Sequence, residues 1–410
     1  MSHDVVIVGA GLAGLMAART CAIHGLDVAV VEAADDVGGR VRTDVVDGLL
    51  IDRGFQLLNP AYPQVRRVLD LDALALRAFV PGVVAMTPRG PVRLADPRQR
   101  PGWAPAALAP AGGSIAAKLR FAAYAWRTAQ ARMPAVMGRP DGTAERALRD
   151  AGVDGVFLER VVRPFLAGVF LEDDLATSRH FLDLVLRSFV RGTPAVPAAG
   201  MGAIPRQLHR ALPPGTVRLS TPARAVAAGR VTTDDGDLTA PIVIVATDAP
   251  AAHALLPTIP AATGRSVTTW SFVADRQPMR DAVLLVDADG PVLNTVVMTN
   301  AAPEYASDGR CLVSASALGV TPAHPDDVRA HLARLYRADT SRWELAATRA
   351  IPYALPPMSV PLNPRPTIDL GEGILLAGDH RATASIQGAM ASGHRAARMA
   401  LQRLRPTLAP

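Results

Sequence analysis

A glycine pattern near the start of the chain could hold a diphosphate. Gly9, Gly11 and Gly14 form the pattern G-x-G-x-x-G. In such a loop the first glycine allows a tight turn, the second lets backbone approach a pyrophosphate, and the third lets a helix pack close to a strand. The helix would start with Leu12 and Ala13, and its N-terminus would offer unpaired N–H groups and a partial positive charge to the phosphates.

The elements around this loop have the order that a dinucleotide site needs. Val5–Val8 is a continuous apolar run, which predicts a strand buried on both faces. Residues 12–23 predict a helix, and residues 27–31 predict a second strand that ends at Glu32 and Ala33. The Glu32 carboxylate can accept hydrogen bonds from a ribose 2′-hydroxyl and would repel a 2′-phosphate. The segment therefore predicts a dinucleotide site, with FAD and NAD as alternatives.

The residues that follow distinguish these two cofactors. Gly38 and Gly39 would let the chain pass close to the phosphates, and Arg40 or Arg42 could place a guanidinium on them. The order E-x-x-x-x-x-G-G-R-x-x-T, starting at Glu32 and following the glycine loop, resembles the flavin-containing amine oxidase and protoporphyrinogen oxidase superfamily, which includes the phytoene desaturases. The resemblance implies FAD rather than NAD.

A second strand, turn and helix is expected near the C-terminus, over residues 375–397. An aspartate at the end of that strand could accept hydrogen bonds from ribityl hydroxyls, and the helix N-terminus could direct free N–H groups at the pyrimidine edge of a flavin, where negative charge develops on reduction. The resemblance assigns these roles to Gly378, Asp379, Ile386, Gln387 and Ala389. His380 could orient a phosphate or, as the favoured interpretation, cap the turn.

Two further groups of cofactor contacts follow from the resemblance alone. It places Gly54, Phe55 and Gln56 beside the isoalloxazine ring, although core packing is an equal alternative for Phe55. It places the strand that contains Ala223 and Val226 beside the adenine.

The resemblance implies an α/β fold in which a discontinuous Rossmann-like FAD-binding domain is interleaved with an α+β substrate domain. The FAD-binding domain would comprise residues 1–60, 200–250 and 365–405. The substrate domain would comprise a mostly helical insert, 61–199, and an antiparallel sheet within 251–364.

The expected activity is that of an FAD-dependent oxidoreductase. Amine oxidases of the superfamily usually carry a lysine near flavin N5, but the single lysine of this chain, Lys118, is not where the family motif places one. The sequence therefore favours dehydrogenation of a hydrophobic small molecule by hydride transfer to N5. The alternatives are a flavin-dependent isomerase without net redox change, an amine oxidase lacking the lysine, and a noncatalytic FAD-binding protein.

The details of the site are less determined. No residue is assigned a catalytic role, and the candidates to line the substrate pocket are Gln56, Asn294 and Tyr353. Covalent members of the superfamily use a cysteine shortly before the last strand. No cysteine follows Cys311 in this chain, so FAD is expected to bind noncovalently. The electron acceptor, oxygen or a quinone, stays open. No metal site and no nucleic-acid-binding module is recognised.

The charge distribution bears on whether the protein binds a membrane surface. The net charge is +6, and residues 89–149 hold eleven basic and three acidic residues, a net charge of +8. Within them a helix is expected with an apolar stripe at Ile115, Leu119, Ala122, Trp126, Ala129 and Met133. The favoured interpretation is that this stripe packs on the domain; the alternative is peripheral contact with an anionic membrane. The two cysteines and the absence of a signal sequence or long apolar run favour a cytoplasmic location.

Overall fold

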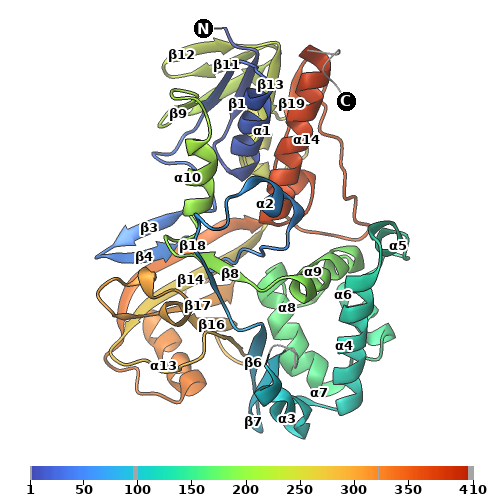
Figure 1. Ribbon diagram of the computed structural model, residues 1–410, viewed down its shortest axis with the longest axis vertical. Helices are drawn as coiled ribbons and strands as arrows, with labels where there is room; N and C mark the ends of the chain where they lie inside the picture. Colours follow the sequence, from blue (N-terminus) through green and yellow to red (C-terminus); the bar gives the residue numbers. More distant parts are fainter. Residues whose placement is uncertain (1, 96–99, 322, 405–410) are drawn as a thin grey trace.

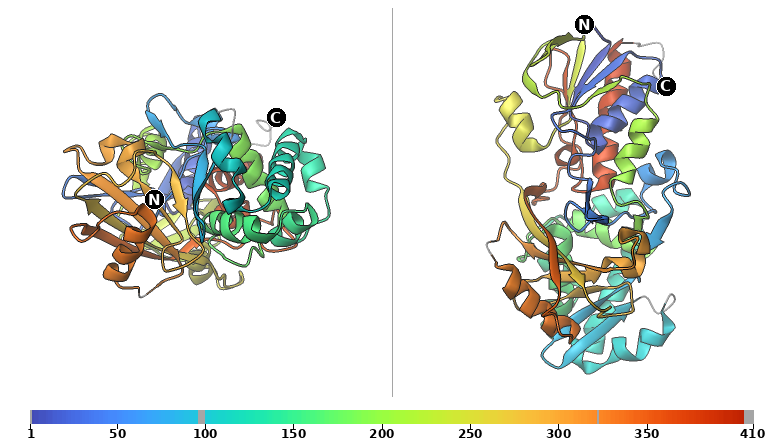
Figure 2. Two further views of the ribbon diagram at one scale, coloured as in Figure 1. Left: turned by 90° about the horizontal axis from the view of Figure 1, so that it is seen from below. Right: turned by 90° about the vertical axis from the view of Figure 1, so that its left-hand side faces the viewer.

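A parallel sheet lies at the end of the molecule that also holds both termini (Figures 1 and 2). The computed structural model describes residues 2–95, 100–321 and 323–404. The five strands of the sheet are all parallel. Their order is β19 (Ile374–Leu376), β13 (Ile242–Val245), β1 (Val5–Val8), β2 (Val28–Val31) and β9 (Val217–Arg218). Three distant parts of the chain thus form one sheet, although the predicted domain boundaries stay a prediction.

Two long helices cross one face of this sheet, α1 (Leu12–Ile23) and α14 (Ile386–Leu404), and lie side by side (Figure 1). Glycines allow the close approach. A Cβ at Gly14 would lie 1.9 Å from the carbonyl oxygen of Gly9, and a Cβ at Gly393 would lie 2.0 Å from that of Ala13. Smaller elements complete this half: α2 (Pro63–Val68), α10 (Ala203–Arg210), α11 (Ala249–Leu255) and the antiparallel strands β10 (Ala223–Ala227), β11 (Arg230–Thr233) and β12 (Gly236–Thr239).

The other half of the molecule contains a seven-stranded sheet, whose neighbours are antiparallel except for β15 and β6. Its order is β18 (Glu344–Leu355), β14 (Arg265–Ala274), β17 (Cys311–Leu318), β16 (Asn294–Val297), β15 (Leu284–Val286), β6 (Gly82–Thr87) and β7 (Gly90–Ala95). The hairpin β6–β7 lies in the insert expected to be mostly helical. It forms strands because Val83, Val84 and Ala85 are buried against the sheet and Gly90 adopts a positive φ at the turn.

Helices make up the remainder of that half, beside the sheet (Figure 1). They are α3 (Ala104–Leu108), α4 (Ile115–Gln130), α5 (Met133–Met137), α6 (Ala144–Asp150), α7 (Gly155–Phe157), α8 (Arg163–Phe170), α9 (Arg179–Arg191), α12 (Met298–Ala301) and α13 (Pro325–Tyr336). Two short pairings connect the halves: β3 (Thr43–Val46) with β4 (Leu49–Asp52), and β5 (Leu76–Ala78) with β8 (Ala195–Pro197).

Helix α4 packs through a different face from the one expected. Ile115, Leu119 and Trp126 of the predicted stripe are 48%, 60% and 47% exposed. The helix instead buries small side chains against α9, and the hydroxyl of its Tyr124 donates to the buried carboxylate of Asp183, 2.6 Å away. Ala129 of the stripe is buried, but its large side chains are exposed, so the favoured interpretation of the stripe as a core-facing surface was wrong for them. Small residues and one buried hydrogen bond determine which face of α4 is packed.

A buried aspartate joins the two halves. Asp52 accepts hydrogen bonds from the hydroxyls of Thr43 (2.5 Å) and Tyr305 (2.6 Å) and from the backbone N–H of Met201 (2.9 Å). These partners come from β3, from the segment after α12 and from the start of α10. Burial raises the pKa of Asp52 to about 6, even though three hydrogen bonds favour the charged form.

Asp52 makes the stability of the fold depend on pH. The folded protein binds a proton at Asp52 more readily than the unfolded chain, whose aspartate has a pKa near 3.8. The contribution of Asp52 to stability is therefore greatest below about pH 4 and falls as the pH rises through 6. We expect the free energy of unfolding of the native chain, relative to Asp52→Asn, to fall by about 2 kcal/mol between pH 4 and pH 7. Urea titrations at each pH measure this difference.

Asp44, on the neighbouring strand, is the matched control. It pairs with Arg53 (2.9 Å) and Arg349 (3.1 Å); burial opposes ionisation, but the hydrogen bonds from these arginines outweigh it and lower the pKa of Asp44. Asp44→Asn should shift the pH dependence in the opposite sense, since the native pair loses stability as the pH falls. Parallel curves for the native chain and Asp52→Asn would contradict the assignment.

Candidate functional site

The glycine loop leaves open space before the N-terminus of α1. Gly9 has a φ of +100°, which only glycine adopts easily, and its N–H donates to the carbonyl of Val31 (2.8 Å). Gly11 caps α1 with an ordinary φ of −71°, and a Cβ there would meet no atom within 4 Å. The first turn of α1, which starts at Leu12 and Ala13, has N–H groups that a helix cannot satisfy internally. The loop thus provides room and donors for a diphosphate.

Glu32 lies at the end of β2, directly against this loop. Its two carboxylate oxygens accept hydrogen bonds from the backbone N–H groups of Ala10 (2.6 Å) and Ala34 (2.9 Å). These bonds fix the carboxylate beside the loop and leave lone pairs for ribose hydroxyls. Ala33 connects Glu32 to the second of these donors.

The two residues predicted to contact adenine both lie on β10. The N–H of Thr221 donates to the carbonyl of Glu32 (2.7 Å), which brings the start of β10, and with it Ala223, to the end of β2. Val226 lies further along β10, and both Ala223 and Val226 pack against a hydrophobic cluster that includes Val231. Ala223 therefore lies closer to Glu32 along the chain of β10 than Val226 does.

The second glycine pair lies against the first loop. The N–H of Gly38 donates to the carbonyl of Ala10 (2.9 Å), and a Cβ at Gly39 would lie 3.7 Å from the Cα of Gly11. Both Gly38 and Gly39 have positive φ, +116° and +60°. This conformation directs the chain past the glycine loop and places Arg40 beside Asp379.

Arg40 joins the two phosphate-like segments of the sequence. Its guanidinium lies 2.7 Å from the carboxylate of Asp379, which follows Gly378, and donates to the carbonyl of Ala354 on β18 (2.6 Å). Asp379 is buried and Arg40 is partly buried. Burial alone would lower the pKa of Arg40, but Asp379 more than offsets it and keeps the guanidinium charged.

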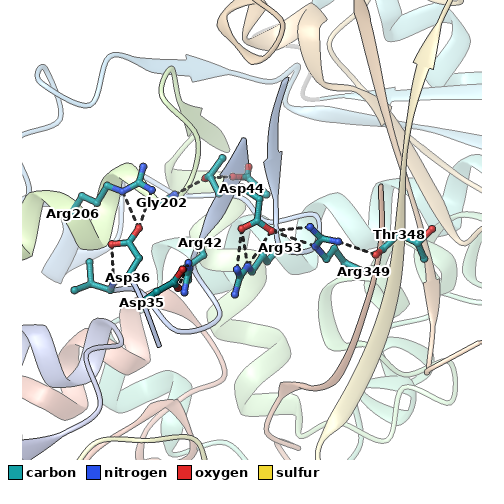
Figure 3. A network of polar contacts seen from close by, with 12 residues as sticks. Asp35, Asp36, Arg42, Asp44, Arg53, Gly202, Arg206, Thr348 and Arg349 are labelled. Carbon is teal, nitrogen blue, oxygen red and sulfur yellow. Dashed lines mark hydrogen bonds and ion pairs between the residues drawn. The ribbon is translucent and has the colours of Figure 1, made fainter. Parts of the chain in front are cut away.

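Arg42, the alternative cation, has another partner. Figure 3 shows its guanidinium on Asp35, at 2.9 Å, in a network that also pairs Arg206 with Asp36. The hydrogen bond from Arg42 lowers the pKa of Asp35. Of the two arginines, Arg40 is thus the one held at Asp379.

The segment Gly54–Gln56 supports the Arg40 loop. The side-chain amide of Gln56 donates to the backbone carbonyls of Arg40 (2.7 Å) and Arg53 (2.9 Å). A Cβ at Gly54 would lie 3.0 Å from the side chain of Ile351 on β18. Phe55 makes an edge contact with Phe79, their ring centroids 6.2 Å apart, which is the packing alternative considered for it.

Buried polar atoms without a protein partner surround Asp379. Among the described residues these include the hydroxyl of Tyr353, whose ring lies 5.6 Å below the Arg40 guanidinium, and both ring nitrogens of His380. Burial lowers the pKa of His380 to about 4, so its imidazole is neutral. His380 does not cap the turn, contrary to the favoured interpretation. Unpaired polar atoms beside the space at Gly11 fit a large polar ligand such as FAD.

The N-terminus of α14 supplies a further set of donors. The N–H of Gly388 is capped by the hydroxyl of Ser385 (3.0 Å), and that of Ala389 donates to the Ser385 carbonyl (2.9 Å). The amides of Ile386 and Gln387 have no acceptor within the described part of the chain. The free donors are thus those of Ile386 and Gln387, and Ala389 is not one of them.

The pocket candidate Asn294 and the single lysine of the chain lie apart from this cluster. Asn294 is on β16, with its amide nitrogen close over Gly168 of α8, and strands β17 and β14 separate it from β18, which carries Tyr353. Lys118 is buried on α4, where its ammonium donates to the carbonyl of Ala109 (2.6 Å). Neither contacts Arg40 or Asp379.

The turn after β13 also belongs to the site and was missed. The carbonyl of Thr247 lies 3.4 Å from where a Cβ of Gly378 would stand, and the charge of Asp248 acts on His380. The signal was present, because ligands of parallel sheets bind at the carboxyl ends of strands. Within residues 2–95, 100–321 and 323–404 no group of three or more His, Cys, Asp or Glu could hold a metal, and no helix there has the length and apolar character to span a bilayer.

Known proteins resemble this chain in parts of the sequence and in the whole fold. Putrescine oxidase from Kocuria rosea is 47% identical over 70 residues, 17% of this chain and 15% of that protein. Protoporphyrinogen oxidase 2 of Arabidopsis thaliana is 36% identical over 101 residues, 22% and 20% of the two chains. Hydroxyneurosporene desaturase of Rubrivivax gelatinosus is 39% identical over 89 residues, 22% and 16%. The matches span a fifth or less of these relatives.

Solved structures match over nearly their full length. Putrescine oxidase bound to putrescine has a TM-score of 0.72 at 19% identity, covering 98% of this chain and 100% of that one. Cyclohexylamine oxidase from Brevibacterium oxydans IH-35A has a TM-score of 0.72 at 15% identity, covering 98% and 99%. These likenesses show the fold. The model of the family "Flavin containing amine oxidoreductase" matches residues 12–401, and the chain therefore belongs to this family of FAD-dependent oxidoreductases.

Proposed function

We propose that the protein binds FAD noncovalently and dehydrogenates a hydrophobic small molecule by hydride transfer to flavin N5. The observation that carries this proposal is the position of Lys118, the single lysine of the chain, which is bonded to the Ala109 carbonyl on α4 and not at the Arg40–Asp379 cluster. A lysine at N5 is thus unavailable for amine oxidation of the usual kind. The names of two relatives, protoporphyrinogen oxidase and hydroxyneurosporene desaturase, support a hydrophobic substrate rather than an amine.

Different residues of the site would contact different parts of the cofactor. The loop Gly9–Gly14 would hold the diphosphate on the N-terminus of α1, and Glu32 would accept from the ribose of the adenosine. Asp379, oriented by Arg40, would accept from ribityl hydroxyls. The free amides of Ile386 and Gln387 would stabilise negative charge at the pyrimidine edge. Bound FAD would supply the hydride acceptor, while these groups would set its orientation and potential.

The positions of the two cysteines support noncovalent binding. Cys21 is buried within α1, where burial raises the pKa of its thiol to about 12, and Cys311 lies on β17. No cysteine follows Cys311 in the sequence. Denaturation should therefore release FAD into the supernatant. Oxygen and a quinone are both candidate electron acceptors.

Anaerobic mixing of the FAD-loaded protein with porphyrinogen, polyene and amine substrates tests the proposal. We expect the flavin absorbance to bleach with a porphyrinogen or a polyene and not with amines, and Lys118→Met to bleach within about twofold of the native rate. Bleaching by amines alone would favour the amine oxidase alternative, which the match to putrescine oxidase supports. A product of unchanged mass, formed only when the flavin is reduced beforehand, would indicate an isomerase.

A further inference from the structure

One face of helix α4 is apolar and exposed. Among the described residues α4 is the only element with more than one large exposed apolar side chain: it carries Ile115, Leu119 and Trp126, and Met133 follows at the start of α5. The helix lies at the outer edge of the helical part of the molecule (Figure 1). The spacing of four and seven residues places the three α4 side chains within an arc of about 40°.

Contacts that hold α4 to the rest of the fold come from another side of the helix. On that side Ala117, Ala125 and Thr128 are buried, and the helix contacts α9 through the Tyr124–Asp183 hydrogen bond and the bond from Arg187 to the Thr128 carbonyl. An exposed apolar stripe of this kind on a helix already held from behind is typical of an interaction site.

Positive charge borders the stripe. Arg120 and Arg127 are exposed along one flank of the arc, about 120° and about 100° from its centre, and Arg132 is exposed directly before Met133. No ion pair in the described part of the chain involves any of these three arginines, whereas Arg139 is paired with Asp183. An apolar stripe with arginines on its flank complements an anionic bilayer, in which acyl chains lie beneath phosphate groups.

We propose that the α4 face, defined as Ile115, Leu119, Trp126 and Met133 with Arg120, Arg127 and Arg132, docks the protein on the surface of an anionic lipid bilayer. The apolar side chains enter the boundary between headgroups and acyl chains, and the guanidiniums contact lipid phosphates. A second copy of the chain fits this face less well, because two surfaces from a segment of net charge +8 repel each other. The inference does not rest on the proposed reaction.

Sedimentation of the full-length protein with vesicles tests the proposal. We expect binding to phosphatidylcholine vesicles that contain phosphatidylglycerol, little binding to phosphatidylcholine alone, and at least a tenfold loss of affinity at high salt. Leu119→Ser with Trp126→Ser should weaken binding at least tenfold. Arg127→Gln and Arg132→Gln should weaken it about fivefold each. Brominated lipid should quench the fluorescence of the native protein more than that of Trp126→Phe.

Ile23→Ser with Val320→Ser is the matched control, since both side chains are exposed and apolar but lie elsewhere. It should bind vesicles like the native protein. Unchanged far-ultraviolet circular dichroism and flavin content show that each variant is folded. Vesicle binding that the α4 variants do not reduce, or equal binding to neutral vesicles, overturns the proposal. So does self-association of the native protein that Leu119→Ser with Trp126→Ser abolishes, which assigns the face to a second copy.

Discussion

Gly11→Ala is expected to leave the FAD-free protein folded and to weaken FAD binding at least tenfold, or about 1.4 kcal/mol. A methyl group at this position meets no atom within 4 Å, and the φ of −71° suits any residue. Nothing in the described protein therefore requires glycine here. The space in front of Gly11 faces the N-terminus of α1, where the diphosphate is expected to lie.

Gly14→Ala is the contrasting control. Its methyl group would lie 1.9 Å from the carbonyl oxygen of Gly9, so this variant must distort the loop or unfold. Thermal melts of the FAD-free proteins should show Gly11→Ala close to the native chain and Gly14→Ala well below it. Equilibrium dialysis with FAD then measures the affinity for the cofactor separately from any effect on folding. Native affinity in Gly11→Ala would place the diphosphate elsewhere, and an unfolded Gly11→Ala would assign the glycine a structural role.

The helices and strands of the candidate site that the sequence predicted correctly are local in the chain. The glycine loop, its helix and the strand ending at Glu32 lie within residues 5–32, and each has a short-range signal: a buried apolar run, a glycine spacing or a terminal carboxylate. The start of α14 at Ile386 has the same kind of signal. Such features depend on backbone geometry that neighbouring residues determine.

The parts that could not be predicted depend on contacts between distant segments. The pair Arg40–Asp379 joins residues 339 positions apart. The buried face of α4 was chosen by Asp183 on another helix, whereas hydrophobic spacing alone pointed to the face that is exposed. Asn294 was proposed for the pocket from its strand position, but the strand order separates it from Tyr353. Periodicity indicates that a helix or strand has a buried face, and tertiary partners decide which one.

The second large effect is expected from a substitution in the pair Arg40–Asp379. Asp379→Asn is expected to yield protein that loses FAD during gel filtration and that is less stable by about 2–3 kcal/mol. The substitution removes the negative charge that faces Arg40 at 2.7 Å and leaves the partly buried guanidinium without its carboxylate. It also replaces one of the two carboxylate oxygens, which are the proposed acceptors for the ribityl hydroxyls, by an amide group that only donates. The ratio of flavin to protein absorbance and urea titrations measure the two losses.

Asp369→Asn is the matched control for the charge change. Asp369 pairs with Arg403 near the same strand, β19, but both side chains are about one third exposed, so the loss should stay within about 1 kcal/mol. A double variant, Arg40→Leu with Asp379→Leu, separates the two roles. Because it removes both charges, it should recover part of the stability but no FAD binding. Recovery of FAD binding in the double variant would mean that the pair serves only the fold, and FAD retention in Asp379→Asn as tight as in the native chain would remove Asp379 from the site.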